Sequence, residues 1–169
     1  MRRVVIVGTT GAGKTTLAHP LAVKLGASHI ELDALHWRAG WTPAPDFVAQ
    51  VECALQAERW VVDGNYSEVQ PLILSRADTI IWLDYSFGTK LRRLFVRTCR
   101  RAFTREALWN GNTETLLNAF FSRESIFVWF FKTHWKQRRR YEARFADLPV
   151  HLTLLRLYEP EEVERLLEA

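Results

Sequence analysis

The segment Gly8–Thr15 has the residue types and the spacing of a phosphate-binding loop. It matches the pattern G-x-x-x-x-G-K-[ST], with a further glycine at position 11. Glycine allows the backbone to turn so that several N–H groups point at one anion. The Lys14 ammonium can reach the β- and γ-phosphates of a nucleotide, and the Thr15 hydroxyl can ligate Mg²⁺. The pattern therefore predicts a nucleotide-binding loop made of Gly8, Thr9, Thr10, Gly11, Ala12, Gly13, Lys14, Thr15 and Thr16.

The segments on both sides of this loop predict a strand before it and a helix after it, the two elements that hold a phosphate-binding loop in place. The β-branched run Arg3–Val7 predicts a buried strand, and the residues after the loop predict a helix to about Leu25, with Gly26 at its end. A helix that begins at the loop adds free N–H groups and the positive end of its dipole. Pro20 inside this helix removes one backbone hydrogen bond and should bend the helix. The alternative, a glycine-rich turn that binds nothing, requires neither the strand nor the helix.

Four further segments predict strands, and the segments between them predict helices. The strands are His29–Glu31, Trp60–Asp63, Thr79–Leu83 and His151–Arg156. The helices are, in residue numbers, about 46–58, 67–76, 91–105, 113–135, 136–144 and 160–168. Strands that alternate with helices predict one α/β domain, residues 1–169, with a parallel sheet. The carboxyl ends of parallel strands are where open α/β sheets bind ligands, and the residues found there are Gly8, Asp33, Asp63 and Asp84.

Positive charge is concentrated in the middle of the chain. Residues 86–144 contain 14 Lys and Arg against 4 Asp and Glu, whereas the whole chain has a formal net charge of +4. Arg93, Arg97 and Arg101 are spaced four residues apart, so one face of a helix would present all three. Such a block can clamp phosphates, bind nucleic acid or form a solvated face. The sequence contains no DNA-reading signature such as a helix-turn-helix, so phosphate binding is the favoured interpretation.

The rest of the composition is typical of a globular protein of the cytoplasm. Hydrophobic residues make up 48% of the 169 residues and charged residues 25%, which is enough for one core. Cys53 and Cys99 have neither C-x-x-C nor metal-site spacing, which favours reduced thiols and a cytoplasmic location. No signal peptide opens the chain, and no apolar run reaches membrane-spanning length. We therefore expect no membrane partner, whereas the oligomeric state stays open.

Four motifs together resemble those of P-loop kinases of the adenylate kinase type. They are Gly8–Thr16, Leu32–Trp37, Trp60–Tyr66, and the stretch from Ala77 to Asp84 followed by Arg93 and Arg97. Over nearly the whole chain, the resemblance is closer to the small bacterial DNA topology modulation proteins (FlaR-like), which are themselves similar to adenylate kinases. This resemblance implies a three-layer P-loop NTPase fold with a five-stranded parallel sheet of order 2-3-1-4-5. It also implies that residues 88–144 form a basic helical lid insertion over bound ATP.

The resemblance also implies roles for single residues. Asp63 matches the Asp of an Asp-Gly pair that holds Mg²⁺ through water, and its place after a buried strand favours this role over that of a turn former. Arg93 and Arg97 match two arginines that bind the transferring phosphates. Asp33 matches an acidic residue that positions the acceptor hydroxyl in sugar- and shikimate-type kinases, and the alternative for it is a helix cap. The catalytic set is then Lys14, Asp33, Arg93 and Arg97, and the magnesium set is Thr15 and Asp63.

The acceptor pocket is expected between residues 33–41 and the turn after the third strand. Its candidate residues are Asp33, His36, Trp37, Gly64, Asn65 and Tyr66, although His36 and Trp37 can equally belong to the core. Nucleoside monophosphate kinases follow the Asp-Gly pair with Phe-Pro-Arg, whose Arg binds the acceptor phosphate. Asn65 and Tyr66 stand there instead, which argues against a monophosphate acceptor. In the basic segment, one of Arg138, Arg139 and Arg140 is expected to reach ATP.

These residues together predict an ATP-dependent phosphotransferase, a kinase that uses ATP and Mg²⁺ and acts on a small-molecule acceptor of nucleotide, nucleoside or sugar type. Phosphoryl transfer needs mainly alignment and charge neutralisation, which Lys14, Arg93 and Arg97 can supply together with Mg²⁺. The alternative is a regulatory ATPase that binds nucleic acid through the basic segment. A nucleotide-binding protein without catalysis is the third interpretation.

Overall fold

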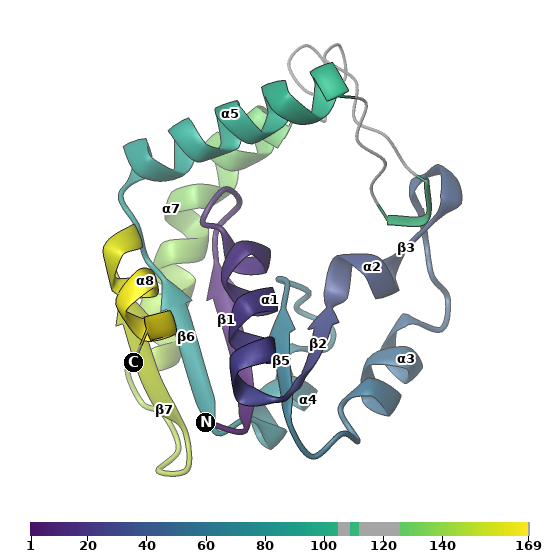
Figure 1. The fold of residues 1–169 in the computed structure, drawn as a ribbon, viewed down its shortest axis with the longest axis vertical. Helices are drawn as coiled ribbons and strands as arrows, with labels where there is room; N and C mark the ends of the chain where they lie inside the picture. The colour runs from purple at the N-terminus through teal and green to yellow at the C-terminus, as the bar shows by residue number, and fades with distance from the viewer. Residues whose placement is uncertain (105–108, 112–125, 169) are drawn as a thin grey trace.

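The computed structural model describes residues 1–104, 109–111 and 126–168, which form a parallel sheet with helices on both faces (Figure 1). The five strands lie in the order β2-β5-β1-β6-β7, and every neighbouring pair is parallel. The predicted α/β fold with a five-stranded parallel sheet is confirmed. The bounds of the strands are Arg3–Gly8 for β1, Ser28–Glu31 for β2, Trp60–Asp63 for β5, Thr79–Leu83 for β6 and Thr153–Leu157 for β7.

The expected strand order, 2-3-1-4-5, has to be restated because the described residues include two strands that the sequence did not predict. β3, Trp37–Arg38, and β4, Thr42–Pro43, pair antiparallel in a separate small sheet. This hairpin lies in the chain between the second and third strands of the main sheet, so the numbering of all later strands shifts. It was missed because each of its strands has only two residues and lies near Gly40 and two prolines, which weaken a strand signal.

Helices surround the sheet and extend beyond it. α1 continues through Pro20. The long helices α5 and α7 reach past the carboxyl ends of the strands, and α5 crosses over the loop between β1 and α1 (Figure 1). The bounds are Lys14–Leu25 for α1, Leu32–His36 for α2, Phe47–Ala54 for α3, Gln70–Arg76 for α4, Phe87–Thr104 for α5, Ile126–Phe145 for α7 and Pro160–Glu168 for α8. Two short 3-10 helices are η1, Ala39–Trp41, and η2, Trp109–Gly111.

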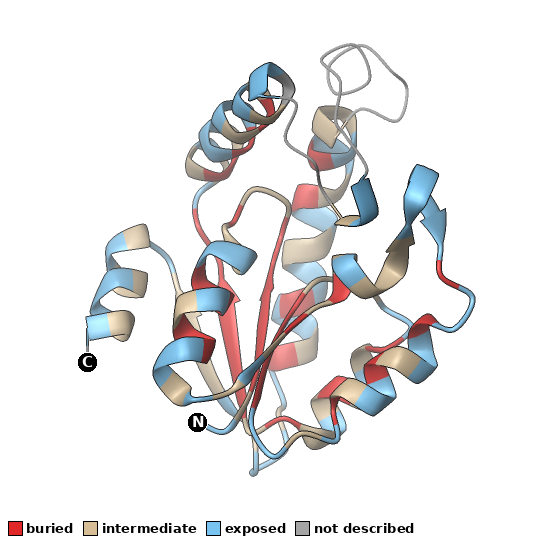
Figure 2. Ribbon diagram, turned by 45° about the vertical axis from the view of Figure 1, so that its right-hand side comes forward, coloured by how far each residue is buried: buried red, intermediate tan, exposed pale blue. Residues whose placement is uncertain are grey.

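The core lies on both faces of the sheet, as the alternation of side chains along a strand requires. In β1, Val5 and Val7 face a cluster that α3, α4 and α7 complete. Val4 and Ile6 face the opposite cluster, which α1 and α8 complete. The central strands β1, β5 and β6 are buried almost throughout because helices cover both faces (Figure 2). These rigid strands hold their carboxyl ends, and the residues that follow them, at one edge of the sheet.

The basic segment 88–144 contributes the two long helices. Its residues 105–108 and 112–125 lie outside the described residues, and so does part of the helix expected at 113–135. From residue 126 the chain forms one continuous helix, α7, where the sequence predicted two. α7 packs on the sheet through Tyr141, whose ring lies 5.8 Å from that of Trp82, and on α5 through Phe130, 5.2 Å from Phe87.

None of the helices in the described ranges is both long enough and apolar enough to traverse a lipid bilayer.

Candidate functional site

The loop between β1 and α1 is built as its glycines predict. Gly11 and Gly13 have φ values of 80° and 88°, in the left-handed region that glycine adopts without strain. Space also demands glycine here: a Cβ on Gly11 would lie 2.6 Å from the Lys90 carbonyl oxygen, and one on Gly13 would lie 3.1 Å from Arg93 Nη1. α1 begins at Lys14, directly after the loop, so the free N–H groups of its first turn lie beside the loop.

Lys14 lies close to several of the residues predicted for the site. Its Nζ donates a hydrogen bond to the Gly8 carbonyl oxygen at 3.1 Å. Burial lowers the pKa of Lys14, the charges of Asp33 and Asp63 oppose this shift, and the charge of Arg97 adds to it. Two predicted carboxylates and one predicted arginine are therefore close enough to act on the same ammonium group.

A cavity of about 1940 Å³ opens at the carboxyl ends of the strands. The predicted residues that line it come from the loop, from α5 and from the acceptor side. They are Thr10, Gly11, Gly13, Lys14, Thr15, Thr16, Asp33, Trp37, Asp63, Gly64, Asn65, Tyr66, Arg93 and Arg97. Thr9 and Ala12 are instead buried inside the loop. Trp109 and Lys132 also line the cavity, although the sequence analysis did not select them.

Asp33 and Tyr66 form a hydrogen-bonded pair on the side of the cavity where the sequence predicts the acceptor. The Tyr66 hydroxyl donates to Asp33 Oδ1 at 2.6 Å. Asp33 is the second residue of α2, and the N-cap position of that helix is Glu31, so Asp33 is not the cap. Burial and the charge of Asp33 raise the pKa of Tyr66, which therefore remains a donor at neutral pH.

His36 lies behind this pair and outside the cavity wall. Its ring lies 4.4 Å from that of Tyr66, 4.8 Å from that of Phe47 and 4.6 Å from that of Trp37. His36 is absent from the described residues that line the cavity, whereas Trp37 is among them. The structure thus places His36 in a supporting aromatic cluster, which is one of the two interpretations that the sequence left open.

Asp63 ends β5 at the cavity and is only 2% exposed. His29 Nε2 lies 3.5 Å from Asp63 Oδ2, and among the described residues this oxygen has no closer hydrogen-bond partner. The contact with Asp63 raises the pKa of His29. Thr15 lines the same cavity at the start of α1. A carboxylate oxygen without a close partner and a hydroxyl group are hard oxygen donors of the kind that Mg²⁺ takes beside phosphates, so Asp63 and Thr15 fit a magnesium ion.

A chain of hydrogen bonds that the sequence did not predict connects the loop to α7. Asn65 Nδ2 donates to the Gly8 carbonyl oxygen at 2.5 Å, the same oxygen that Lys14 contacts. The Tyr141 hydroxyl donates to Asn65 Oδ1 at 2.8 Å. Burial raises the pKa of Tyr141 to about 12, so its hydroxyl stays protonated. No local sequence signal identifies Tyr141, because 76 residues separate it from Asn65.

Arg93 and Arg97 lie on the face of α5 that is turned toward the loop. Arg93 Nη1 donates to the Ala12 carbonyl oxygen at 3.4 Å, and its guanidinium carbon lies 5.1 Å from the centre of the Tyr85 ring. Arg97 is near enough to lower the pKa of Lys14. Both arginines line the cavity, one helical turn apart, as their spacing predicts.

Asp84 is the buried centre of an ion cluster next to the site. It accepts hydrogen bonds from Arg156 Nε and Nη2 at 3.1 and 2.6 Å, and it lies 3.2 Å from Arg138 Nε and 3.9 Å from Lys90 Nζ. Burial lowers the pKa of Lys90 to about 8. The cluster joins β6, β7, α5 and α7. Because none of the three arginines at 138–140 lines the cavity, this geometry gives no support to the expectation that one of them reaches ATP.

One sequence relative has a known activity, and no protein family model matches the chain. The relative is a shikimate kinase of Thermobifida fusca (strain YX), 31% identical over 112 residues. The match covers 57% of this chain and 65% of that protein.

Solved structures of P-loop kinases have the same fold over nearly the whole chain. A shikimate kinase from Bacteroides thetaiotaomicron superposes with a TM-score of 0.59 at 14% identity, covering 99% of this chain and 94% of that one. A deoxyadenosine kinase from M. mycoides, with its products dCMP and dCDP bound, gives a TM-score of 0.56 at 16% identity, covering 98% and 94%. At such low sequence identities, the similarity shows only the fold. This fold is the one found in shikimate kinase-like P-loop kinases.

Proposed function

We propose that the protein is an ATP-dependent phosphotransferase that transfers the γ-phosphoryl group to a hydroxyl group of a small molecule. One observation carries this proposal: a single cavity is lined by the phosphate-type loop on one side and by the Asp33–Tyr66 pair on the other. Both partners of a transfer reaction can therefore lie in one space. The relative of known activity and the structural neighbours, which are small-molecule kinases, support the same reaction class.

On the donor side, the loop would bind the phosphates of ATP through its backbone N–H groups and the start of α1. Lys14 leaves the Gly8 carbonyl oxygen to contact the β- and γ-phosphates. Arg93 and Arg97 neutralise charge that develops on the transferring group, where electrostatic stabilisation has its largest effect. Thr15 directly and Asp63 through water would hold Mg²⁺, which when bound neutralises charge on the β- and γ-oxygens.

On the acceptor side, Asp33 would orient the attacking hydroxyl and take its proton. Tyr66 occupies Asp33 Oδ1 and so leaves Oδ2 to accept from the substrate. The hydroxyl oxygen then bonds to the γ-phosphorus, the bond from that phosphorus to the β,γ-bridging oxygen breaks, and ADP leaves. Trp37, Gly64, Asn65 and Tyr66 would complete the acceptor side.

We further propose that the chain is one domain, residues 1–169, in which segment 88–144 acts as a lid over ATP. α5 supports this role because it already lies on the loop through Arg93, and it presents the other cavity arginines. Among P-loop kinases, we place the chain with the adenylate kinase-like topology modulation proteins, on the motifs Leu32–Trp37 and Trp60–Tyr66. We expect it in the cytoplasm, where the free thiols of Cys53 and Cys99 stay reduced.

A regulatory ATPase that acts on nucleic acid is the alternative, and the geometry favours it less. Arg93 and Arg97 line the cavity beside the loop, where they can bind the phosphates of a nucleotide. The test is to incubate the protein and ATP·Mg²⁺ with nucleosides, sugars and polyols, and to measure ADP release with and without each compound. We expect at least one compound to raise ADP release and to appear as its phosphate ester. ADP release that DNA stimulates and that no small molecule changes would contradict the kinase assignment.

A further inference from the structure

The carbonyl group of Gly8, the last residue of β1, points to the side of that strand where β5 lies. The Trp60 N–H donates to the Arg2 carbonyl oxygen at 2.9 Å. Carbonyl groups alternate in direction along a strand, so that of Gly8, an even number of residues after Arg2, points the same way. The register pairs Ile6 with Asp63, where β5 ends, so β5 has no residue opposite Gly8. The Gly8 carbonyl oxygen therefore needs donors from outside the strand pair.

Two side chains supply these donors. Lys14 Nζ donates to the Gly8 carbonyl oxygen at 3.1 Å, and Asn65 Nδ2 donates to it at 2.5 Å. A carbonyl oxygen has two lone pairs, so it can accept both bonds at once. Lys14 has to give up its bond in order to reach the phosphates of ATP. Because Gly8 is buried, its oxygen would then lose affinity for the bound state unless Asn65 remained as a donor.

The amide group of Asn65 can take only one of its two orientations. A carbonyl oxygen only accepts, so the NH₂ group of Asn65 has to face Gly8 and its Oδ1 has to face Tyr141. The Tyr141 hydroxyl donates to Asn65 Oδ1 at 2.8 Å. Burial raises the pKa of Tyr141 to about 12, so this hydroxyl keeps its proton at neutral pH. Tyr141 thereby selects the orientation of the amide in which Asn65 supports Gly8.

The backbone and the packing hold both side chains in place. Gly64 turns the chain after β5 with a φ of 130°, and a Cβ on Gly64 would lie 2.6 Å from the Cβ of Leu32. The turn that presents Asn65 therefore requires glycine. Tyr141 is 5% exposed, and its ring stacks on that of Phe145 with the ring centres 5.6 Å apart. The two polar groups consequently meet without a loose side chain between them.

We propose that Asn65 and Tyr141 are positioning residues for ATP binding, which keep the Gly8 carbonyl oxygen hydrogen-bonded while Lys14 moves to the phosphates. Asn65 has this task in addition to lining the cavity. Tyr141 is absent from the described residues that line the cavity, and it acts on the loop through Asn65. This inference rests on the proposed function and adds a residue of α7 to the groups that support ATP binding.

The affinity for a non-hydrolysable ATP analogue with Mg²⁺, measured by titration calorimetry, tests the proposal without an acceptor. Asn65→Leu keeps nearly the same shape and removes the donor. It should weaken binding about tenfold, because a buried acceptor without a partner then appears in the bound state alone. Tyr141→Phe keeps the ring and lets the amide turn, so it should weaken binding about threefold. Unchanged affinity in both variants would overturn the inference.

The Lys14→Ala background separates this role from a general loss of structure. Without Lys14, the loss of Asn65 leaves the Gly8 carbonyl oxygen without a side-chain donor both before and after ATP binds, so its cost cancels. The effect of Asn65→Leu should therefore shrink to less than about twofold in this background, which a double-mutant cycle at high analogue concentrations measures. An effect of the same size in both backgrounds would show a purely structural role and overturn the inference.

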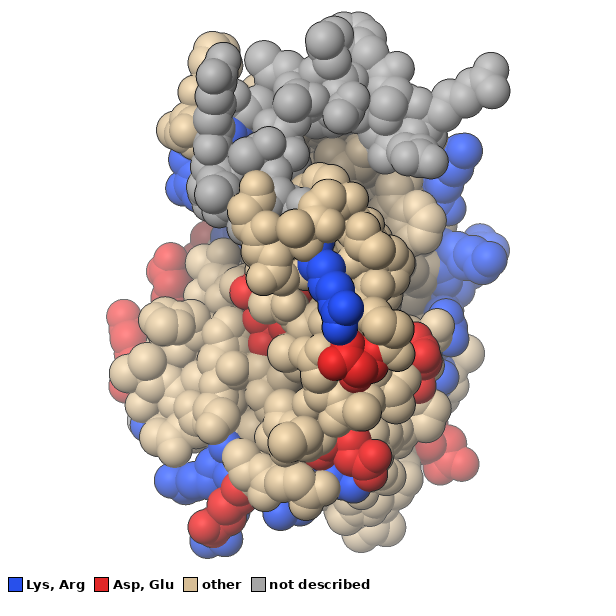
Figure 3. All heavy atoms as spheres, turned by 90° about the vertical axis from the view of Figure 1, so that its right-hand side faces the viewer, with Lys and Arg blue, Asp and Glu red and all other residues tan. Residues whose placement is uncertain are grey.

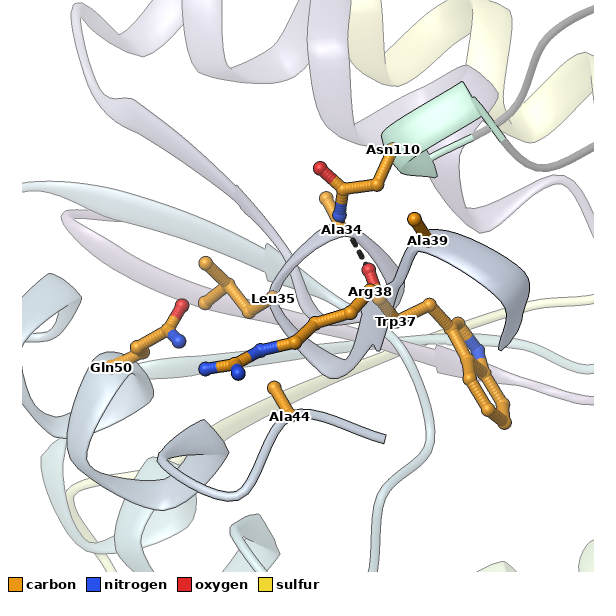
Figure 4. Close-up of a pocket in the computed structure, with 8 residues that line it drawn as sticks. All are labelled: Ala34, Leu35, Trp37, Arg38, Ala39, Ala44, Gln50 and Asn110. Atoms are coloured by element: carbon orange, nitrogen blue, oxygen red, sulfur yellow. Dashed lines mark hydrogen bonds between the residues drawn. The ribbon is translucent and has the colours of Figure 1, made fainter. Parts of the chain in front are cut away.

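Gln50→Met and Tyr158→Phe are the matched controls, since they remove an amide and a phenol hydroxyl elsewhere. Gln50 and Leu35 line a separate pocket of about 490 Å³ (Figure 4). Figure 3 shows the outer face over α2, α3 and the hairpin, the elements that contribute most of this pocket. Tyr158 is exposed, and neither control residue is among the described residues that line the main cavity. Both variants should keep the original affinity, and a tenfold loss in either would contradict the proposed role.

The outcomes also separate this inference from the proposed function. Analogue binding that responds to the variants as expected, in a protein that transfers phosphate to no acceptor, would contradict the kinase function and support the inference. Normal transfer with unchanged affinity in the variants would do the reverse. An original protein that binds no ATP analogue would overturn both. If Asn65→Leu does not fold by circular dichroism, Tyr141→Phe, alone and combined with Lys14→Ala, decides the same question.

Discussion

The two sides of the cavity are built in different ways. The phosphate loop of the donor side is a run of consecutive residues, Gly8–Thr16, that turns directly from a buried strand into a helix. The acceptor side is assembled from α2, the hairpin, the turn after β5 and η2, which lie far apart in the chain. The residues proposed to bind the phosphates are therefore consecutive in the sequence, whereas those proposed to bind the acceptor come together only through long-range contacts.

The two sides also differ in charge. Arg93 and Arg97 lie over the loop beside Lys14, whereas the side proposed for the acceptor presents the Asp33 carboxylate and several indole rings. A donor with several phosphates needs the first environment. A hydroxyl group that must lose a proton needs the second. Variants on the two sides should consequently change different kinetic constants.

The largest expected effect is on the donor side, from Lys14→Ala. Loss of the ammonium that reaches the transferring phosphates should lower kcat on the order of 10³-fold, since one preorganised group at the reacting centre contributes this much. Steady-state ADP release measures it. Lys24→Ala is the matched control, because Lys24 lies on the same helix and binds the Leu167 carbonyl oxygen at 2.8 Å. A folded Lys14→Ala protein with normal turnover would refute the assignment of the loop.

Asp33→Asn should impair transfer to the acceptor and leave ATP binding intact. Without a base for the hydroxyl proton, transfer should fall by about 10²-fold, while the affinity for an ATP analogue stays the same. Titration calorimetry and product formation separate the two effects. Asp46→Asn is the control, since that carboxylate pairs with Arg38 on the surface. Normal transfer by Asp33→Asn would leave Asp33 with a structural role only.

Arg93→Ala and Arg97→Ala should each reduce acceptor-dependent turnover at least about tenfold, a loss of about 1.4 kcal/mol of transition-state stabilisation. The reason is that both guanidinium groups face the loop, where charge develops during transfer. Arg76→Ala, which removes an arginine paired with Glu52 away from the cavity, is the control for charge. If turnover persisted while DNA affinity fell in both variants, the regulatory ATPase would replace the kinase.

The smallest expected effect concerns stability at acid pH, at the contact between α5 and α7. His134 on α7 is 1% exposed, between Phe87 and Phe130, and burial lowers its pKa to about 4. The unfolded chain has a histidine pKa of about 6.5. Between these values the unfolded chain binds a proton that the folded one does not, so the free energy of unfolding should fall as pH falls from 6.5 to 4.

Urea unfolding at several pH values in this window measures the effect. His134→Phe removes the titrating group and should make the fall with acid shallower. Identical pH slopes in the variant and the original protein would show that His134 contributes nothing to acid sensitivity.

The sequence was most informative where a function depends on neighbouring residues. The loop, the five strands and the position of Arg93 and Arg97 on one face of a helix followed from local pattern and spacing. The sheet was predictable because runs such as Thr79–Leu83 are apolar throughout and end at polar residues. The segment around Trp37 was harder, because its hairpin has two-residue strands whose pairing no periodicity reveals.

Long-range contacts account for the rest. Tyr141 reaches the loop through Asn65, and Trp109 reaches the hairpin through its neighbour Asn110, across 73 or more residues of chain. No local pattern signals such contacts, since they depend on how α7 and η2 pack after the sheet has formed. For the same reason, His36 could be assigned to the cavity or to the core only once its ring contacts were known.

The central claim is that one cavity brings the γ-phosphate of ATP and an acceptor hydroxyl together. Phosphorus-31 NMR of a reaction with ATP·Mg²⁺ and the compound that most raises ADP release tests it most directly, because it shows where the γ-phosphoryl group goes. The account predicts a phosphate monoester of the acceptor that forms in a one-to-one ratio with ADP, and neither product with Lys14→Ala. Inorganic phosphate as the sole product, or ATP that stays unchanged, would contradict it.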